Sequence, residues 1–129
     1  MVRRGAPTAL VLASLMLAAC AGGGGGAAGK PAGGGPQNVT VKGADTFKFD
    51  PATVSVRSGA PVHLTLDNTG ALVHDWVVDD LDGKKVAVEA QPGRSVSADF
   101  TPTKPASYEF YCSQPGHREA GMKGTLTIS

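Results

Sequence analysis

Short runs in which apolar and polar side chains alternate recur along the chain after residue 37. They cover residues 39–41, 53–56, 62–66, 76–78, 86–90, 95–100, 108–112 and 125–128. Turn-forming pairs such as Ser58-Gly59, Asp82-Gly83 and Pro92-Gly93 separate the runs. Alternation with a period of two predicts half-buried strands, and no window in this region has the period of a helix. The sequence therefore predicts an all-β fold of about eight strands, arranged as an antiparallel Greek-key sandwich or barrel.

The N-terminal segment has the features of an export signal. Arg3 and Arg4 give it a positive start, and residues 9–18 form an apolar run that is short for a membrane span. Residues 17–20 read Leu-Ala-Ala-Cys and resemble a bacterial lipobox, which makes residues 1–19 a lipoprotein signal peptide and Cys20 the lipidated residue. An ordinary signal peptide cut after Ala19 would instead leave Cys20 as a free thiol. The lipobox predicts an exported protein, anchored by lipid to the extracytoplasmic face of a bacterial membrane in the periplasm or at the cell surface.

A change of composition separates this segment from the rest of the chain. Residues 21–36 are almost only Gly, Ala and Pro, with Lys30 as their one charged residue. We expect residues 20–36 to be a flexible linker with a reach on the order of 20 Å. Residues 37–129 then form one domain without internal repeats. Nine of the twelve basic and all eleven acidic residues lie in this domain, so we expect no nucleic-acid surface, and we expect a monomer.

The chain has two cysteines, Cys20 and Cys112. In an exported protein, two cysteines ordinarily suggest one disulfide. If Cys20 carries lipid, Cys112 has no partner. A lone thiol in an oxidising compartment is expected to be buried or bound to a metal. The lipobox therefore strengthens a metal-binding interpretation of Cys112.

The loop that follows Cys112 contains three potential metal ligands. Cys112, His117 and Met122 have the spacing Cys-x4-His-x4-Met. A thiolate and an imidazole with a weak thioether nearby make up most of a mononuclear copper electron-transfer site, which needs one further His. Each residue alone has a simpler explanation, because a buried Cys or Met can be a core residue and a loop His can be solvated. The joint pattern favours copper.

Two histidines remain as candidates for the missing ligand. His63 lies between Val62 and Leu64 on the polar face of its run, so we interpret it as a surface residue. His74 follows the loop 68–73 and begins the next strand, where it can point into the end of the sandwich that carries Cys112. The sequence therefore predicts a copper site made of His74, Cys112, His117 and Met122.

The domain resembles the cupredoxins, the family of blue copper proteins. The resemblance extends through nearly all of residues 37–129, and the loop spacing is most similar to that of the auracyanins. It implies one copper ion that cycles between Cu(I) and Cu(II) and shuttles single electrons between redox proteins, and it implies a carrier rather than an enzyme. The residues that carry the resemblance include Phe49-Asp50-Pro51, Gly59, the 62–68 segment, His74 and Gly121-Met122-Lys123-Gly124. By the same resemblance, His74, Cys112 and His117 are the strong trigonal ligands and Met122 is the long axial one.

One residue beside the first ligand departs from the family pattern. Many cupredoxins have Asn after this His, whereas this chain has Asp75. The Asp75 carboxylate can accept a hydrogen bond from Ser113, and its negative charge would favour Cu(II).

Electrons are expected to leave through His117, and redox partners are expected to dock around it. The proposed docking patch is small and apolar and consists of Leu72, Val73, Pro115, Gly116 and Ala120. Alternatively, these residues only close the end of the sandwich. The acidic cluster Asp79-Asp80-Leu81-Asp82, with the following Lys84-Lys85, is interpreted as a solvated hairpin.

Other functions remain open at this point. A copper chaperone or buffer shares the ligand types, but such proteins usually expose clusters of Met or His, and Met122 is the one Met outside the signal region. A copper enzyme would need further His ligands, and only His63 is spare. A binuclear copper centre would need a second Cys in the loop. A metal-free sandwich lipoprotein is the third alternative.

Overall fold

This computed structural model describes residues 34–129 of the chain. These residues contain nine strands and no helix. The predicted signal peptide, the lipidated Cys20 and nearly all of the predicted linker lie outside the described residues. No described segment could cross a membrane as a helix. The strands are β1 (Gln37–Ala44), β2 (Lys48–Asp50), β3 (Thr53–Val56), β4 (Val62–Asn68), β5 (His74–Leu81), β6 (Lys84–Ala90), β7 (Ser95–Phe100), β8 (Ala106–Tyr111) and β9 (Lys123–Ile128).

The strands form two sheets, with the order β2-β1-β4-β7 in one and β3-β9-β8-β5-β6 in the other. The prediction of an all-β sandwich is confirmed. The sheets are mixed rather than purely antiparallel, because β1 pairs with β4 and β3 pairs with β9 in parallel. Strand β2 was not predicted, since three residues are too few to show alternation.

The alternating residues of β4 show how the core forms. Val62, Leu64 and Leu66 are almost fully buried, while His63 and Thr65 lie on the opposite, partly exposed face. The His63 side chain is 45% exposed, which confirms His63 as a surface residue, and its Nδ1 atom lies 2.7 Å from an Asp99 carboxylate oxygen on β7. Each large apolar side chain buried in this way contributes about 1.5–3 kcal/mol to folding.

Aromatic rings fill the space between the sheets. The Phe110 ring on β8 lies 5.3 Å, between centroids, from both the Trp76 ring on β5 and the Phe49 ring on β2. The Trp76 ring also stacks on Phe100 of β7 at 6.1 Å. These contacts join both sheets next to the strand ends from which His74 and Cys112 project.

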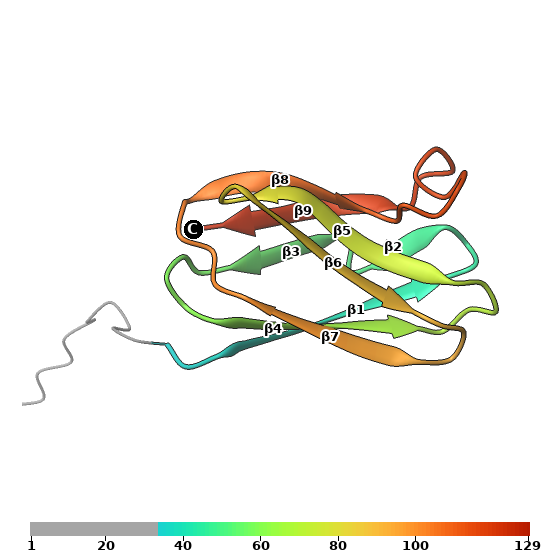
Figure 1. The fold of residues 1–129 in the computed structure, drawn as a ribbon, viewed down its shortest axis with the longest axis horizontal. Coiled ribbons are helices and arrows are strands. Elements are labelled where there is room, and N and C mark those ends of the chain that lie inside the picture. Colours follow the sequence, from blue (N-terminus) through green and yellow to red (C-terminus); the bar gives the residue numbers. More distant parts are fainter. Residues whose placement is uncertain (1–33) are drawn as a thin grey trace, which may run out of the picture. The chain divides into compact units, whose positions relative to one another are not determined.

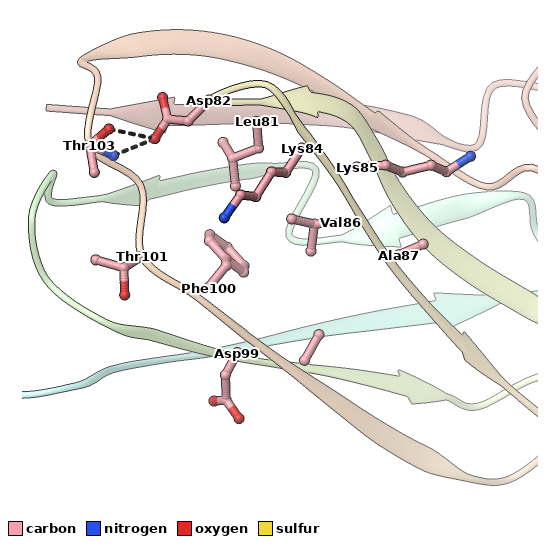
Figure 2. Close-up of a pocket in the computed structure, with 11 residues that line it drawn as sticks. Leu81, Asp82, Lys84, Lys85, Val86, Ala87, Asp99, Phe100, Thr101 and Thr103 are labelled. Atoms are coloured by element: carbon pink, nitrogen blue, oxygen red, sulfur yellow. Dashed lines mark hydrogen bonds between the residues drawn. The ribbon is translucent and has the colours of Figure 1, made fainter.

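The acidic hairpin between β5 and β6 has a structural role at one of its residues. Asp82 and Gly83 both have positive φ, 55° and 83°, as expected for an Asp-Gly hairpin turn. The Asp82 carboxylate accepts hydrogen bonds from the N–H and the hydroxyl of Thr103, and the N–H bond lowers the pKa of Asp82 (Figure 2). Asp79 and Asp80 are exposed, in agreement with a solvated hairpin.

A groove of about 630 Å³ lies between the edge strands β6 and β7 (Figure 2). Leu81, Val86 and Phe100 give it an apolar floor, and Lys84 and Asp99 stand among its polar lining residues. None of the predicted copper ligands lines this groove.

Four connections lie at the end of the sandwich opposite the C-terminus (Figure 1). They are the β1–β2 turn, the β4–β5 loop, the β6–β7 turn and the protruding β8–β9 loop. Asn68, buried at the end of β4, shapes the β4–β5 loop: its side-chain amide donates to the carbonyls of Leu72 and Ala90 and accepts the Gly70 N–H. This end of the sandwich contains all the predicted copper ligands.

Candidate metal centre

Three of the predicted ligands lie together in the structure. The ligand atoms of His74, Cys112 and His117 all lie within 4.8 Å of one another. The Cys112 Sγ atom is 3.3 Å from Nδ1 of His117 and 3.9 Å from Nδ1 of His74. His74 and Cys112 are fully buried, and His117 is partly exposed. Residues 38 positions apart in the chain therefore converge as expected.

The strand ends position these side chains. His74 is the first residue of β5, and Cys112 directly follows the last residue of β8. The N–H of Asp75 points at the Cys112 sulfur, with a donor–acceptor distance of 3.5 Å. The Cys112 N–H donates to the Met122 carbonyl at 3.0 Å, which closes the base of the loop between β8 and β9.

Main-chain hydrogen bonds hold the loop in a compact form. The Met122 N–H donates to the His117 carbonyl at 2.9 Å, and the His117 N–H donates to the Gln114 carbonyl at 3.0 Å. Gly116 and Gly121 have φ values of 81° and 104°, which a side chain would disfavour. The loop therefore presents His117 and Met122 in a fixed arrangement.

Met122 is fully buried beside His74. A Cβ atom added to Gly43 would lie 3.2 Å from the Met122 methyl group and 3.5 Å from the His74 Cβ atom. The two side chains therefore approach the same point on β1, where Gly43 leaves the space they occupy. This role of Gly43 was not predicted, because it depends on β1 lying next to both loops.

The donor set fits a copper ion. Metal bonds of roughly 2.0–2.3 Å to nitrogen and sulfur would place the atoms of a trigonal set about 3.5–4 Å apart. The two sulfur–nitrogen distances, 3.3 and 3.9 Å, are close to this range. Two imidazoles, one thiolate and a weak thioether are the ligands of blue-copper electron-transfer sites.

Burial controls the protonation of the thiol. Burial is the largest influence and raises the pKa of the Cys112 thiol. The hydrogen bond from the Asp75 N–H acts in the opposite direction, and the resulting pKa is about 11. Without metal, the thiol is therefore protonated at neutral pH. Binding of a metal by the thiolate must release this proton.

Asp75 and Ser113 make the contact that the sequence suggested. Asp75 is 6% exposed, and its two carboxylate oxygens accept hydrogen bonds from the N–H and the hydroxyl of Ser113. The β5 strand start and the loop after Cys112 are thus joined by a buried carboxylate. This negative charge lies next to the ligand cluster.

Sequence reasoning did not identify two residues of the β1–β2 turn that contact the histidines. An Asp45 carboxylate oxygen lies 3.0 Å from Nε2 of His74, and the Phe47 ring lies 4.7 Å from the His117 ring. The N–H of Ala71 donates to Asp45 and lowers its pKa. No motif could have revealed these contacts, because Asp45 and His74 are 29 positions apart in the chain.

Most residues of the predicted docking patch lie at the surface. Leu72 is 45% exposed and is one of two exposed large apolar side chains among the described residues. Pro115, Gly116 and Ala120 are also exposed, and Val73 is partly buried.

A β-sandwich that brings one Cys and two His together, with a Met beside them, is characteristic of small mononuclear copper proteins. The sequence model described as a cupredoxin-like domain matches residues 8–128. The chain belongs to the cupredoxin family. Cupredoxins bind one copper ion, and those related to this chain include electron-transfer proteins and a copper-resistance protein, so the predicted family and cofactor are confirmed.

Two relatives illustrate the range of the family. The chain is 33% identical over 109 residues to the copper-resistant cuproprotein CopI of Rubrivivax gelatinosus, an alignment that covers 71% of this chain and 66% of CopI. The chain therefore spans about two thirds of the length of CopI. The chain is 34% identical over 104 residues to plastocyanin of Scenedesmus fuscus, with 70% of this chain and 99% of plastocyanin covered.

Solved auracyanin structures share the fold. The reduced auracyanin of Roseiflexus castenholzii has a TM-score of 0.66 and 22% identity, and the match covers 74% of this chain and 99% of that one. Auracyanin B has a TM-score of 0.63 and 27% identity, with 72% of this chain and 88% of that chain covered. The resemblance to auracyanins that the loop spacing indicated is confirmed in the fold.

Proposed function

We propose that this protein is a membrane-tethered type 1 copper protein that carries single electrons between redox proteins. The observation that carries the proposal is the buried cluster of His74, Cys112 and His117, whose ligand atoms lie within 4.8 Å of one another. These residues would be the strong ligands, and Met122 the weak axial one. Copper held there would supply a one-electron couple between Cu(I) and Cu(II).

The surrounding residues explain how the site would favour electron transfer over catalysis. The Cys112 sulfur lies 3.9 and 3.3 Å from the nearest histidine nitrogens, close to the spacing of a trigonal copper site, so a change in the charge of the copper would need little rearrangement. His74, Cys112 and Met122 are fully buried, which excludes water from most of the site. Four protein ligands leave no position for a substrate, and His117, the partly exposed ligand, offers the shortest route to a partner.

Redox partners would dock on the apolar patch around His117, formed by Leu72, Val73, Pro115, Gly116 and Ala120. Small apolar surfaces suit weak and transient complexes, in which the partners separate after each transfer. The exposure of Leu72, two residues before the ligand His74, and the partial exposure of His117 support this proposal.

We expect Leu72→Lys to slow electron exchange with a redox partner about tenfold, because docking would desolvate the new ammonium group. The visible spectrum of the copper form should not change, since Leu72 is not a ligand. Stopped-flow mixing with a partner protein measures the rate. Val96→Lys is the matched control, because Val96 is the other exposed large apolar residue and lies on β7. Equal rates for Leu72→Lys and wild type would exclude docking at this patch.

The proposed location is the extracytoplasmic face of a bacterial membrane. Residues 1–19 would be removed, Cys20 would carry the lipid, and residues 20–36 would let the copper domain (residues 37–129) reach its partners. We expect wild-type protein to sediment with membranes and to have the mass of a diacylated chain. Cys20→Ala should lose both properties. Sedimentation of Cys20→Ala with membranes, together with an unmodified wild-type mass, would contradict lipid anchoring.

A copper chaperone or buffer is the second candidate, and the 33% identity to CopI favours it. Within residues 34–129, however, the one Met is buried, and no exposed cluster of Met or His offers an entry site for copper. The rate at which the protein releases Cu(I) to a chelator distinguishes the two functions. A carrier of electrons retains copper through many redox cycles, whereas a chaperone releases it within the time of mixing.

A further inference from the structure

The β1–β2 turn places a carboxylate against the first histidine of the cluster. The Asp45 Oδ1 atom lies 3.0 Å from Nε2 of His74, on the side of the ring away from Cys112. The His74 side chain is completely buried, and the Asp45 side chain is 38% exposed. Asp45 is therefore in contact with a buried ring that water cannot reach.

The hydrogen-bond chemistry of this contact assigns the His74 tautomer. A carboxylate only accepts hydrogen bonds, so Nε2 of His74 carries the proton that faces Asp45. In a neutral imidazole the other nitrogen then has a free lone pair. That nitrogen, Nδ1, is the one 3.9 Å from the Cys112 sulfur. The contact with Asp45 thus leaves the ring ready to bind a metal.

Two main-chain groups hold the carboxylate in place. The Ala71 N–H donates to Oδ2 of Asp45 at 2.7 Å, and the Leu72 N–H donates to Oδ1 at 3.2 Å. Both donors belong to the loop that precedes His74. The carboxylate therefore fixes the loop and the ligand ring together.

We propose that Asp45 is a positioning residue for the copper site, which sets the tautomer and orientation of His74 and favours Cu(II) through its negative charge. The inference rests on the proposed function, because it assigns His74 as a ligand. Carboxylates that accept a hydrogen bond from a metal-binding imidazole orient the ring and make it more basic. Asp45 supplies such a carboxylate from a turn that contains no ligand itself.

Asp45→Asn tests this role sharply, because an amide cannot replace both oxygens. With its oxygen at the Oδ1 position, the amide N–H₂ group would face the Ala71 N–H donor. With its oxygen at the Oδ2 position, the N–H₂ group would face Nε2 of His74 and favour the opposite tautomer. Either arrangement loses a hydrogen bond that the wild-type protein makes.

The first measurement requires no copper. Nitrogen-15 NMR of the full-length, copper-free protein at neutral pH should show His74 protonated at Nε2 in wild type. In Asp45→Asn, the Nδ1-protonated form should become detectable. Wild-type His74 protonated at Nδ1 would overturn the proposal, even if the variant failed to fold.

The second measurement is the affinity of the protein for Cu(II) and for Cu(I), together with the reduction potential of the copper-loaded protein. We expect Asp45→Asn to bind Cu(II) at least tenfold more weakly, with a smaller change for Cu(I). A tenfold loss of affinity for Cu(II) relative to Cu(I) raises the reduction potential by about 59 mV. The matched control is Asp99→Asn, which removes a similar carboxylate–histidine contact at the exposed His63. A potential equal to that of wild type in Asp45→Asn would overturn the proposal.

The two measurements separate this inference from the proposed function. A wild-type protein that binds Cu(II) without an intense visible band would refute the type 1 site, while the His74 tautomer would still confirm or exclude the role of Asp45 in the copper-free protein. An intense band with an unchanged tautomer and potential in Asp45→Asn would refute the role of Asp45 alone.

Discussion

Cys112→Ser abolishes the intense visible absorption that we expect from the Cu(II) form of the wild-type protein. That absorption requires a thiolate bound to copper, and Cys112 is the one cysteine among the described residues. The serine hydroxyl is a harder ligand than the thiolate and does not suit this soft site. We also expect Cu(II) to bind at least a hundredfold more weakly. Absorption spectroscopy and a copper titration of the purified protein measure both effects.

The fold should survive this substitution, so that the loss can be assigned to the site. Ser is close to Cys in size, and the main-chain N–H of residue 112 still donates to the Met122 carbonyl. Circular dichroism should show an unchanged β-sheet spectrum. Cys20→Ser is the matched control, because it removes the other cysteine and should keep the band. An intense band in Cys112→Ser would show that another group binds the copper.

The second large effect concerns Asp75. We expect Asp75→Asn to raise the reduction potential, because it removes a buried negative charge that stabilises Cu(II) more than Cu(I). A ten- to a hundredfold change in the preference between the two ions corresponds to about 60 to 120 mV. Redox titration followed by the visible band measures the shift.

Asn is a suitable replacement at this position. Its carbonyl oxygen can accept the Ser113 N–H, and its amide can donate to the Ser113 hydroxyl, so the link to the Cys112 loop is retained. Asp80→Asn is the control, because Asp80 is an exposed carboxylate on the same strand. Equal potentials for Asp75→Asn and wild type would mean that the charge of Asp75 does not act on the copper site.

The features that depend on local pattern could be predicted from the sequence. Alternation placed eight of the nine strands, and the polar face of the 62–66 run showed that His63 is a surface residue. Cys112, His117 and Met122 share one loop, so their spacing alone indicated the chemistry. His74 could be added because it begins a strand at the same end of the sandwich.

The features that depend on contacts between distant segments could not be predicted. Alternation has the same appearance in parallel and antiparallel strands, so the β1–β4 pairing was not visible. Asp45 and Phe47 belong to a turn without any motif, and they contact the histidines because β1 runs beside β4. Gly43 leaves room for the side chains of Met122 and His74, but this contact exists only in the folded protein.

The most direct test of the type 1 copper site is a titration of the copper-free wild-type protein with Cu(II). The site built from His74, Cys112, His117 and Met122 predicts an intense visible band that saturates at one copper ion per chain. It also predicts that the band disappears on addition of one electron and returns on reoxidation without loss of copper. A weak band, or copper that is lost on reduction, would contradict the proposed electron carrier.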